Sequence, residues 1–134
     1  TPIGFGRGIL NNAGFQDLLR LDAIDVLRPD IALHGITQIR KAAALAETYY
    51  VAVAPFHRGG PVATAAALHL AASIPNFFVQ EVPFPASDQD RRMRAELVAP
   101  VVESVTDGYF ALPTRPGLGV TLNPEALRKY GNRR

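Results

Sequence analysis

Short apolar runs alternate with amphipathic stretches along most of this sequence, and this alternation restricts the possible folds more than any other feature. The four runs cover residues 1–5, 23–27, 51–55 and 77–82. Each has the length of a buried parallel strand and lacks the in-out alternation of a half-exposed antiparallel strand. Strands that alternate with helices in this way predict right-handed βαβ units and a parallel sheet.

The stretches between and after the runs have helical features. Pro61 suits a first helical position, because its missing N–H would have no partner there. Asp107-Gly108 is a strong hairpin signal, and Asn123 before Pro124 predicts the cap of a last helix. We expect helices over residues 11–22, 36–49, 61–73 and 88–99, then a hairpin and a C-terminal helix.

Composition narrows the class of protein. The 134 residues are 48% hydrophobic and 19% charged, which is typical of one globular domain. The net charge is +2 and the basic residues are scattered, so we expect no nucleic-acid partner. No apolar run approaches the ~20 residues of a membrane span, so we expect no membrane partner. The absence of cysteine fits a reducing compartment, and we expect a cytoplasmic protein.

Polar residues stand at the ends of all four apolar runs. They are Arg7, Asp30, His57 and Glu81, separated by 23, 27 and 24 residues. In a (β/α) barrel, the carboxyl ends of successive strands project into one mouth, where catalytic groups lie. The spacing therefore predicts that these four side chains converge.

Chemistry suggests a role for each carboxyl and imidazole group. Asp30 could orient His57 as a general acid/base dyad, and a buried, protonated Glu81 could donate to an oxyanion. Structural roles compete with these: His57 as a loop histidine, Asp30 as a turn or cap residue, Glu81 as a paired carboxylate. His34, near a helix start, is a candidate contact for a substrate anion. A separate possibility is an anion-binding protein that uses the helix N-terminus at Gly59-Gly60-Pro61.

Four motifs together resemble a known family. They are "RPDIALHGIT", "VAPFHRGGP", "IPNFFVQE" and "PGLGVTL". In this order they are similar to the C-terminal half of the enolase superfamily, mandelate racemase/muconate lactonizing group, and especially to galactonate dehydratase-like enzymes. The resemblance implies an α/β fold, the C-terminal half of a (β/α)7β TIM-type barrel. Residues 1–134 would supply strands five to eight, about four β/α units, plus a C-terminal hairpin and helix, without the N-terminal capping domain and first half-barrel.

The resemblance also implies an activity. The family's Asp-His dyad falls on Asp30 and His57, and its last-strand Glu falls on Glu81. The implied reaction is acid-sugar dehydration: removal of the proton α to a carboxylate, stabilisation of the enediolate by Mg²⁺, and loss of the β-hydroxyl. The implied substrate is a small sugar-acid carboxylate.

Two positions depart from the family pattern. Arg7 stands where a Glu ligand of Mg²⁺ is expected, so we assign no metal ligand in this chain and expect Arg7 to face a substrate carboxylate instead. Phe56 intervenes where the similar dehydratases read Ala-Pro-His directly. The alternative to an enzyme is a catalytically inactive fragment of the same fold with a structural or assembly role.

Chain length predicts a partner. A barrel of this type needs roughly 250 residues, so 134 residues leave open sheet edges with unpaired backbone groups. We therefore expect a homo-oligomer, or a complementary chain that carries the missing half-barrel.

Overall fold

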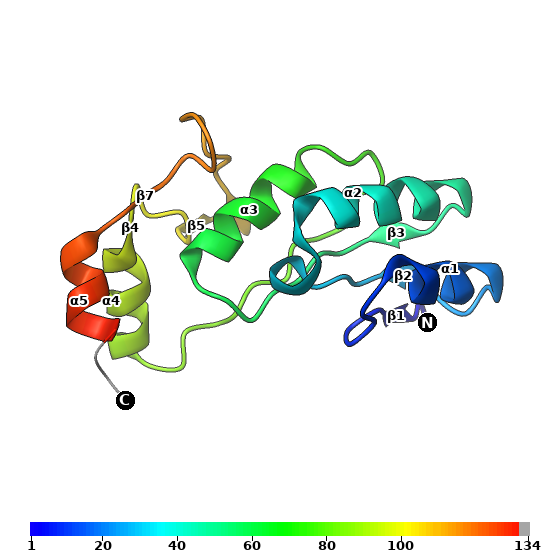
Figure 1. The fold of residues 1–134 in the computed structure, drawn as a ribbon, viewed down its shortest axis with the longest axis horizontal. Helices are drawn as coiled ribbons and strands as arrows, with labels where there is room; N and C mark the ends of the chain where they lie inside the picture. The colour runs from blue at the N-terminus through cyan, green and yellow to red at the C-terminus, as the bar shows by residue number, and fades with distance from the viewer. Residues whose placement is uncertain (132–134) are drawn as a thin grey trace.

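The computed structural model describes residues 1–131 and contains the expected parallel sheet. Its strands are β1 (Gly4–Phe5), β2 (Val26–Leu27) and β3 (Ala52–Val53), in the order β1-β2-β3. Both pairings are parallel, with Gly4 beside Val26 and Val26 beside Ala52. The first three apolar runs therefore form neighbouring strands, as their pattern predicts (Figure 1).

The fourth apolar run follows β3 without becoming a regular strand. Val53 pairs with Phe77 in an isolated parallel bridge, and the N–H of Phe78 donates to the Val53 carbonyl at 2.9 Å. Further along, the N–H of Glu81 donates to the Pro55 carbonyl at 3.1 Å. Pro55 has no N–H to donate in return, so the ladder cannot continue regularly. The expected strand over residues 77–82 is thus an extended edge segment.

Three helices connect and cover these strands. They are α1 (Asn12–Arg20), α2 (Ile31–Thr48) and α3 (Pro61–Ala71). The helix expected over residues 36–49 begins earlier, because the Asp30 side chain caps α2 by accepting from the Ala32 N–H. Gly35, with φ 69° and ψ 169°, then interrupts the helical backbone. Only glycine adopts that conformation readily, so α2 contains a kink one turn after its start.

The main core lies between the sheet and the helices α1, α2 and α3. Apolar side chains from each element are fully buried, which removes them from water and holds the layers together. Its members include Phe15, Leu19, Leu27, Ile39, Val53, Ala67 and Leu70.

The C-terminal part forms a second group of elements. These are α4 (Asp88–Leu97), β4 (Val98–Ala99), β5 (Val105–Thr106), β6 (Tyr109–Phe110), β7 (Thr121–Leu122) and α5 (Pro124–Gly131). Figure 1 shows α4 and α5 side by side at the end of the molecule remote from β1–β3, with α3 between. A small core of Ala65, Val98 and Val102 joins α3 to this group.

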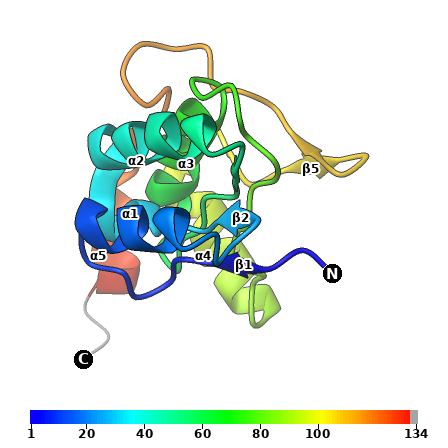
Figure 2. The ribbon, with the colours of Figure 1, turned by 90° about the vertical axis from the view of Figure 1, so that its right-hand side faces the viewer.

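The expected hairpin and last helix are confirmed. β5 and β6 pair antiparallel around Asp107-Gly108, and the hairpin projects away from the helices (Figure 2). Asn123 accepts hydrogen bonds from the N–H groups of Glu125 and Ala126 at the start of α5. The helix expected over residues 88–99 ends at Leu97, because the next two residues pair antiparallel with β7. The helices α1 and α3 are likewise shorter than expected, ending at Arg20 and Ala71.

None of the helices among residues 1–131 combines the length and the apolar character needed to cross a membrane.

Candidate functional site

Two arginines meet over a buried aromatic ring at the carboxyl ends of the strands. The guanidinium carbon of Arg7 lies 5.5 Å from the centroid of the Phe56 ring, and that of Arg28 lies 5.8 Å from it. Phe56 is only 2% exposed. Both distances are within the range of cation–π attraction, so the ring holds two positive charges at this edge of the sheet.

Glu81 joins this cluster through Arg28. The Arg28 Nη2 group donates to Glu81 Oε2, forming an ion pair between the ends of the second and fourth apolar runs. The buried environment expected for Glu81 is not found, because its side chain is 49% exposed. Its position at the edge of the sheet, where the regular ladder fails, leaves it open to solvent. The structure therefore places Glu81 beside an arginine rather than beside His57.

Asp30 has a structural role in the described residues. Its Oδ1 accepts from the Ala32 N–H at 2.9 Å, which caps α2. In the sheet register Asp30 pairs with Phe56. Successive side chains of an extended segment point to opposite faces, so Phe56 shares the face of Asp30 and His57 takes the other. Among residues 1–131, no hydrogen bond joins Asp30 to His57.

His57 instead belongs to a chain of polar side chains that are buried except for the partly buried Glu103. Its Nε2 lies 3.2 Å from Thr64 Oγ1 on α3, and Thr64 donates to Glu103 Oε1. Arg94 on α4 donates to both Glu103 oxygens, at 2.7 and 2.6 Å. His57 and Thr64 are 2% and 0% exposed. We call His57, Thr64, Glu103 and Arg94 the buried polar network.

The network fixes the tautomer of His57. Thr64 has a single hydroxyl proton, which it donates to Glu103, so its oxygen accepts from His57 and Nε2 carries the hydrogen. Nδ1 is then the basic nitrogen, and it is buried without a hydrogen-bond partner among the described residues. Its neighbour is Gly59, whose carbonyl accepts from Arg94 at 3.2 Å. Nδ1 therefore lies against the Gly59 backbone, which raises the pKa of His57.

The surroundings of His57 shift its titration. Burial lowers the pKa of His57 from its usual value of 6.5, because desolvation disfavours the imidazolium. The Glu103 carboxylate raises the pKa of His57, and the Arg94 guanidinium lowers it further. The charge of Asp30 also raises this pKa, with the smallest effect of the groups around His57. The imidazole of His57 therefore stays neutral down to a lower pH than that of a solvent-exposed histidine.

His34 is held by the backbone rather than directed at a ligand. Its Nδ1 lies 2.9 Å from the Asp30 carbonyl oxygen, and its Nε2 lies 2.8 Å from the Ile9 carbonyl oxygen. Its ring also packs against Phe15, with 5.1 Å between centroids. Both ring nitrogens therefore have protein partners, and His34 ties the loop after β1 to the start of α2.

Five residues of these two clusters were not predicted from the sequence. Arg28 stands two residues before Asp30 at a strand end, and this position was a signal that could have identified it. Phe56 was noted only as an interruption of the family pattern. Thr64, Glu103 and Arg94 gave no signal, because a threonine in a helix and charges near a helix end are usually solvated or structural.

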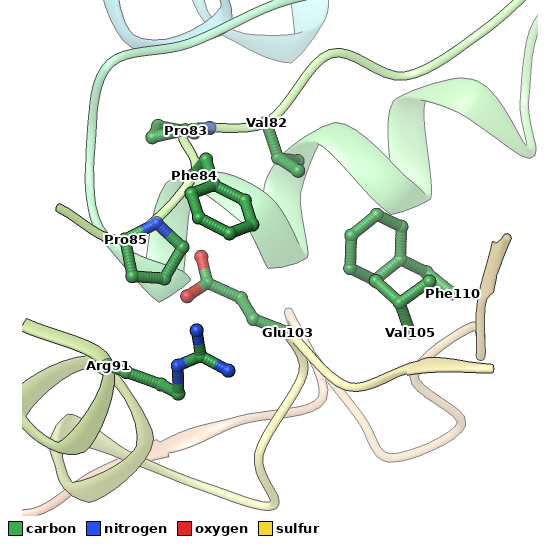
Figure 3. Close-up of a pocket in the computed structure, with 8 residues that line it drawn as sticks. All are labelled: Val82, Pro83, Phe84, Pro85, Arg91, Glu103, Val105 and Phe110. Carbon is green, nitrogen blue, oxygen red and sulfur yellow. The ribbon is translucent and has the colours of Figure 1, made fainter. Parts of the chain in front are cut away.

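A cavity of about 350 Å³ lies beside Glu103. In Figure 3 the Glu103 carboxylate points between Phe84, Pro85 and Arg91, and Phe110 lies on the opposite side with Val105. The segment 82–85 comes directly after Glu81, so the cavity opens near the carboxyl end of the sheet. Glu103 belongs both to the lining of this cavity and to the buried polar network.

The residues present do not fit the Mg²⁺ ion that the family resemblance implies. Hard dications need oxygen ligands, whereas the end of β1 presents the Arg7 guanidinium and the end of β2 presents Arg28. Glu81 pairs with Arg28, and Asp30 caps α2. The described residues contain no group of three metal-binding side chains. A guanidinium pair at this place would repel a cation.

Comparisons with known proteins agree with the arrangement of the elements. Residues 1–126 match the family described as Enolase C-terminal domain-like. The chain is 35% identical over 131 residues to a D-galactonate dehydratase from Pectobacterium atrosepticum, covering 94% of this chain and 34% of that protein. It is 31% identical to a D-xylonate dehydratase from Haloferax volcanii, covering 97% of this chain and 31% of the relative. The chain thus spans about a third of the length of the curated relatives it matches.

Solved structures give the same result. A putative dehydratase from Salmonella enterica serovar Typhimurium matches with a TM-score of 0.86 and 35% identity, over 96% of this chain and 31% of that chain. An enolase from Agrobacterium radiobacter, described as a putative galactarate dehydratase with bound Na and L-malate, matches with a TM-score of 0.83 and 32% identity. That match covers 96% of this chain and 35% of the other.

Proposed function

Because this chain belongs to the enolase C-terminal domain-like family, we propose that it supplies the C-terminal half-barrel of an acid-sugar dehydratase-like enzyme. Its fold is the C-terminal half of a (β/α)7β barrel, related to the mandelate racemase/muconate lactonizing proteins and to galactonate dehydratases. The observation that carries the proposal is similarity to named sugar-acid dehydratases over more than nine-tenths of this chain. The proposed substrate is a small sugar-acid carboxylate.

The proposed chemistry is removal of the proton α to the carboxylate, followed by loss of the β-hydroxyl group. His57 is the candidate proton acceptor, because the buried polar network holds its hydrogen on Nε2 and leaves Nδ1 basic. The same imidazole, once protonated, can assist departure of the hydroxyl group. Asp30 acts on His57 through its charge. The residues at the strand ends do not fit a metal ion, so both steps are assigned to side chains of this chain.

The test is turnover of D-galactonate and D-xylonate, followed as formation of the 2-keto-3-deoxy product. The His57→Asn variant should lose activity by a factor on the order of 10²–10⁴, the usual contribution of a positioned acid or base. His69→Asn, in the last turn of α3, is the matched control and should retain activity. Turnover that persists unchanged in His57→Asn would exclude the proposed role of His57.

A second candidate function is a catalytically inactive protein of the same fold with a structural or assembly role. It is favoured by the register, in which Phe56 rather than His57 pairs with Asp30. It is also favoured by the burial of Nδ1. Under this alternative the unaltered chain turns over neither sugar acid. Turnover of either sugar acid by the unaltered chain would exclude this alternative.

The remaining barrel strands are proposed to come from another polypeptide segment or a second copy of the chain. Among residues 1–131, β1 has a strand neighbour on only one side. An unpaired edge of this kind exposes N–H and C=O groups that bind another strand. Completion of the sheet would enclose the strand-end residues in a mouth, as catalysis requires.

A further inference from the structure

We infer that Arg7 and Arg28, the arginine pair stacked on Phe56, form a carboxylate-binding site at the strand ends in place of a divalent-cation site. The choice of a sugar acid as the ligand rests on the proposed function, whereas the preference for an anion rests on the charges of this chain.

The charge balance of the cluster favours an anion. Arg28 is neutralised by Glu81, and the Asp30 carboxylate is directed at the backbone N–H of Ala32 at the start of α2. Arg7 contacts the Phe56 ring and has no ion pair among residues 1–131. Among these residues Arg28 thus has a bonded carboxylate, and Arg7 has none. A ligand carboxylate would pair with Arg7, and a dication would add to the repulsion.

The aromatic ring makes this arrangement stable without a metal. Phe56 is buried, so its position is fixed by packing, and its ring attracts both guanidinium groups. A guanidinium presents five N–H donors in a planar fork that matches the two oxygens of a carboxylate. While it stacks on a ring, its edge stays free to donate. The guanidinium group of Arg7 therefore lies over the Phe56 ring while its N–H groups remain available to a ligand.

The backbone around Arg7 is also fixed. Gly6 has φ +143°, and a Cβ atom there would lie 2.8 Å from the Arg28 carbonyl oxygen. The chain after β1 therefore packs directly on the backbone at Arg28, as only glycine allows. The Ile9 N–H closes the turn by donating to the Gly6 carbonyl at 3.2 Å. This turn holds Arg7 next to Arg28 before any ligand arrives, which reduces the entropy lost on binding.

The chemical class of the ligand follows from the donors. Bidentate guanidinium groups recognise carboxylates, and a sugar acid carries one such group on a polyol chain. A similar solved structure is described with L-malate, a small dicarboxylate, bound. Sulfate and other inorganic anions share the charge but not the planar shape, so they serve as probes that separate a carboxylate site from a general anion site.

The experiment is calorimetric titration of the unaltered chain at low ionic strength with D-galactonate, galactitol, sulfate and MgCl₂. We expect D-galactonate to bind and galactitol, which lacks the carboxylate, not to bind. Arg7→Gln should weaken D-galactonate binding at least tenfold, and Arg40→Gln, an equal charge change on the exposed face of α2, should not. Arg7→Glu should abolish D-galactonate binding, because it replaces the guanidinium by a carboxylate that repels the anion.

The readout is binding alone, so its failure can be told apart from failure of the proposed function. D-galactonate binding by the unaltered chain without turnover would support the inference and count against the proposed function. Equal affinity of the unaltered chain and Arg7→Gln, or absence of D-galactonate binding to the unaltered chain, would overturn the inference. Binding of sulfate without D-galactonate, or of Mg²⁺ to the unaltered chain, would also overturn it. Circular dichroism spectra identical to the unaltered chain confirm that the exposed Arg7 variants fold.

Discussion

Phe56 and His57 are neighbours in sequence but belong to different environments. Phe56 lies under Arg7 and Arg28, and His57 lies against Thr64 on α3. The cause is the period of two in an extended chain, since one inserted residue transfers the next side chain to the opposite face. One residue thus decides whether the imidazole faces the strand ends or the C-terminal elements.

The buried polar network should contribute strongly to stability. Glu103→Gln removes the charge that Arg94 needs while Arg94 remains buried, and breaking a buried pair in this way costs about 3 kcal/mol. Urea unfolding followed by circular dichroism measures the change. Glu96→Gln, which breaks the exposed pair with Lys129, should leave the midpoint nearly unchanged. Equal effects of the two substitutions would show that burial does not strengthen the network.

Titration of His57 should make stability depend on pH. Because burial lowers the pKa of His57 in the folded state, the unfolded chain binds the proton more tightly. The free energy of unfolding is therefore highest above pH ~6.5 and falls as the pH drops from there toward the folded pKa. Urea unfolding at pH 7.5 and 5.5 measures this loss. The His57→Asn variant should lose less stability between pH 7.5 and pH 5.5 than the unaltered chain. An equal loss in both proteins would contradict a lowered pKa of His57.

At the scale of elements, α2 shows how caps and backbone geometry outweigh periodicity. The apolar stripe of this helix begins at Ile36, yet the helix starts at Ile31 because Asp30 caps it. Gly35 separates the first turn from the rest. That first turn carries His34, whose ring binds the loop after β1. The kink at Gly35 thus separates the first turn of α2, whose His34 contacts the loop after β1, from the rest of the helix.

Gly35→Ala should destabilise the protein through backbone strain alone. Its φ of +69° with ψ of 169° is nearly restricted to glycine, and an added Cβ would meet no atom within 4 Å. We expect a loss of about 1–3 kcal/mol, measured by urea unfolding. Gly60→Ala, with φ −85° and equally open space, is the control and should cost clearly less. A neutral Gly35→Ala would mean that α2 can straighten without loss.

At the scale of the whole molecule, two groups of elements are joined along a long axis. The sheet with α1 and α2 lies at one end, and α4 with α5 at the other (Figure 1). The buried polar network and the core of Ala65, Val98 and Val102 connect them through α3. Large apolar side chains remain exposed on the edge segment after β3, including Phe78 at 66%. Such a surface is typical of an interaction site.

We expect the chain to self-associate or to bind a segment that completes the sheet. Sedimentation velocity over a range of concentrations should detect species larger than the monomer. Phe78→Lys should shift the distribution toward the monomer, because it places a charge on the exposed edge. Leu21→Lys, at a position 76% exposed at the end of α1, is the control and should have no effect. A single monomeric species at every concentration would contradict this expectation.

The sequence by itself determined the order and kind of most elements. Apolar runs bounded by polar residues identified β1, β2 and β3, and local signals identified the α5 cap at Asn123 and the hairpin at Asp107-Gly108. These features depend on residues near one another in the chain, so local chemistry is enough to specify them. The family motifs added the half-barrel, which the comparisons confirm.

Only the tertiary structure decided which side chains meet. Arg28 with Glu81 and His57 with Thr64 and Glu103 depend on sheet register and on how the C-terminal elements pack against α3. The pairing of β4 with β7 likewise joins residues more than twenty positions apart. Contacts of this kind follow from the placement of whole elements in space, and no local pattern encodes that placement.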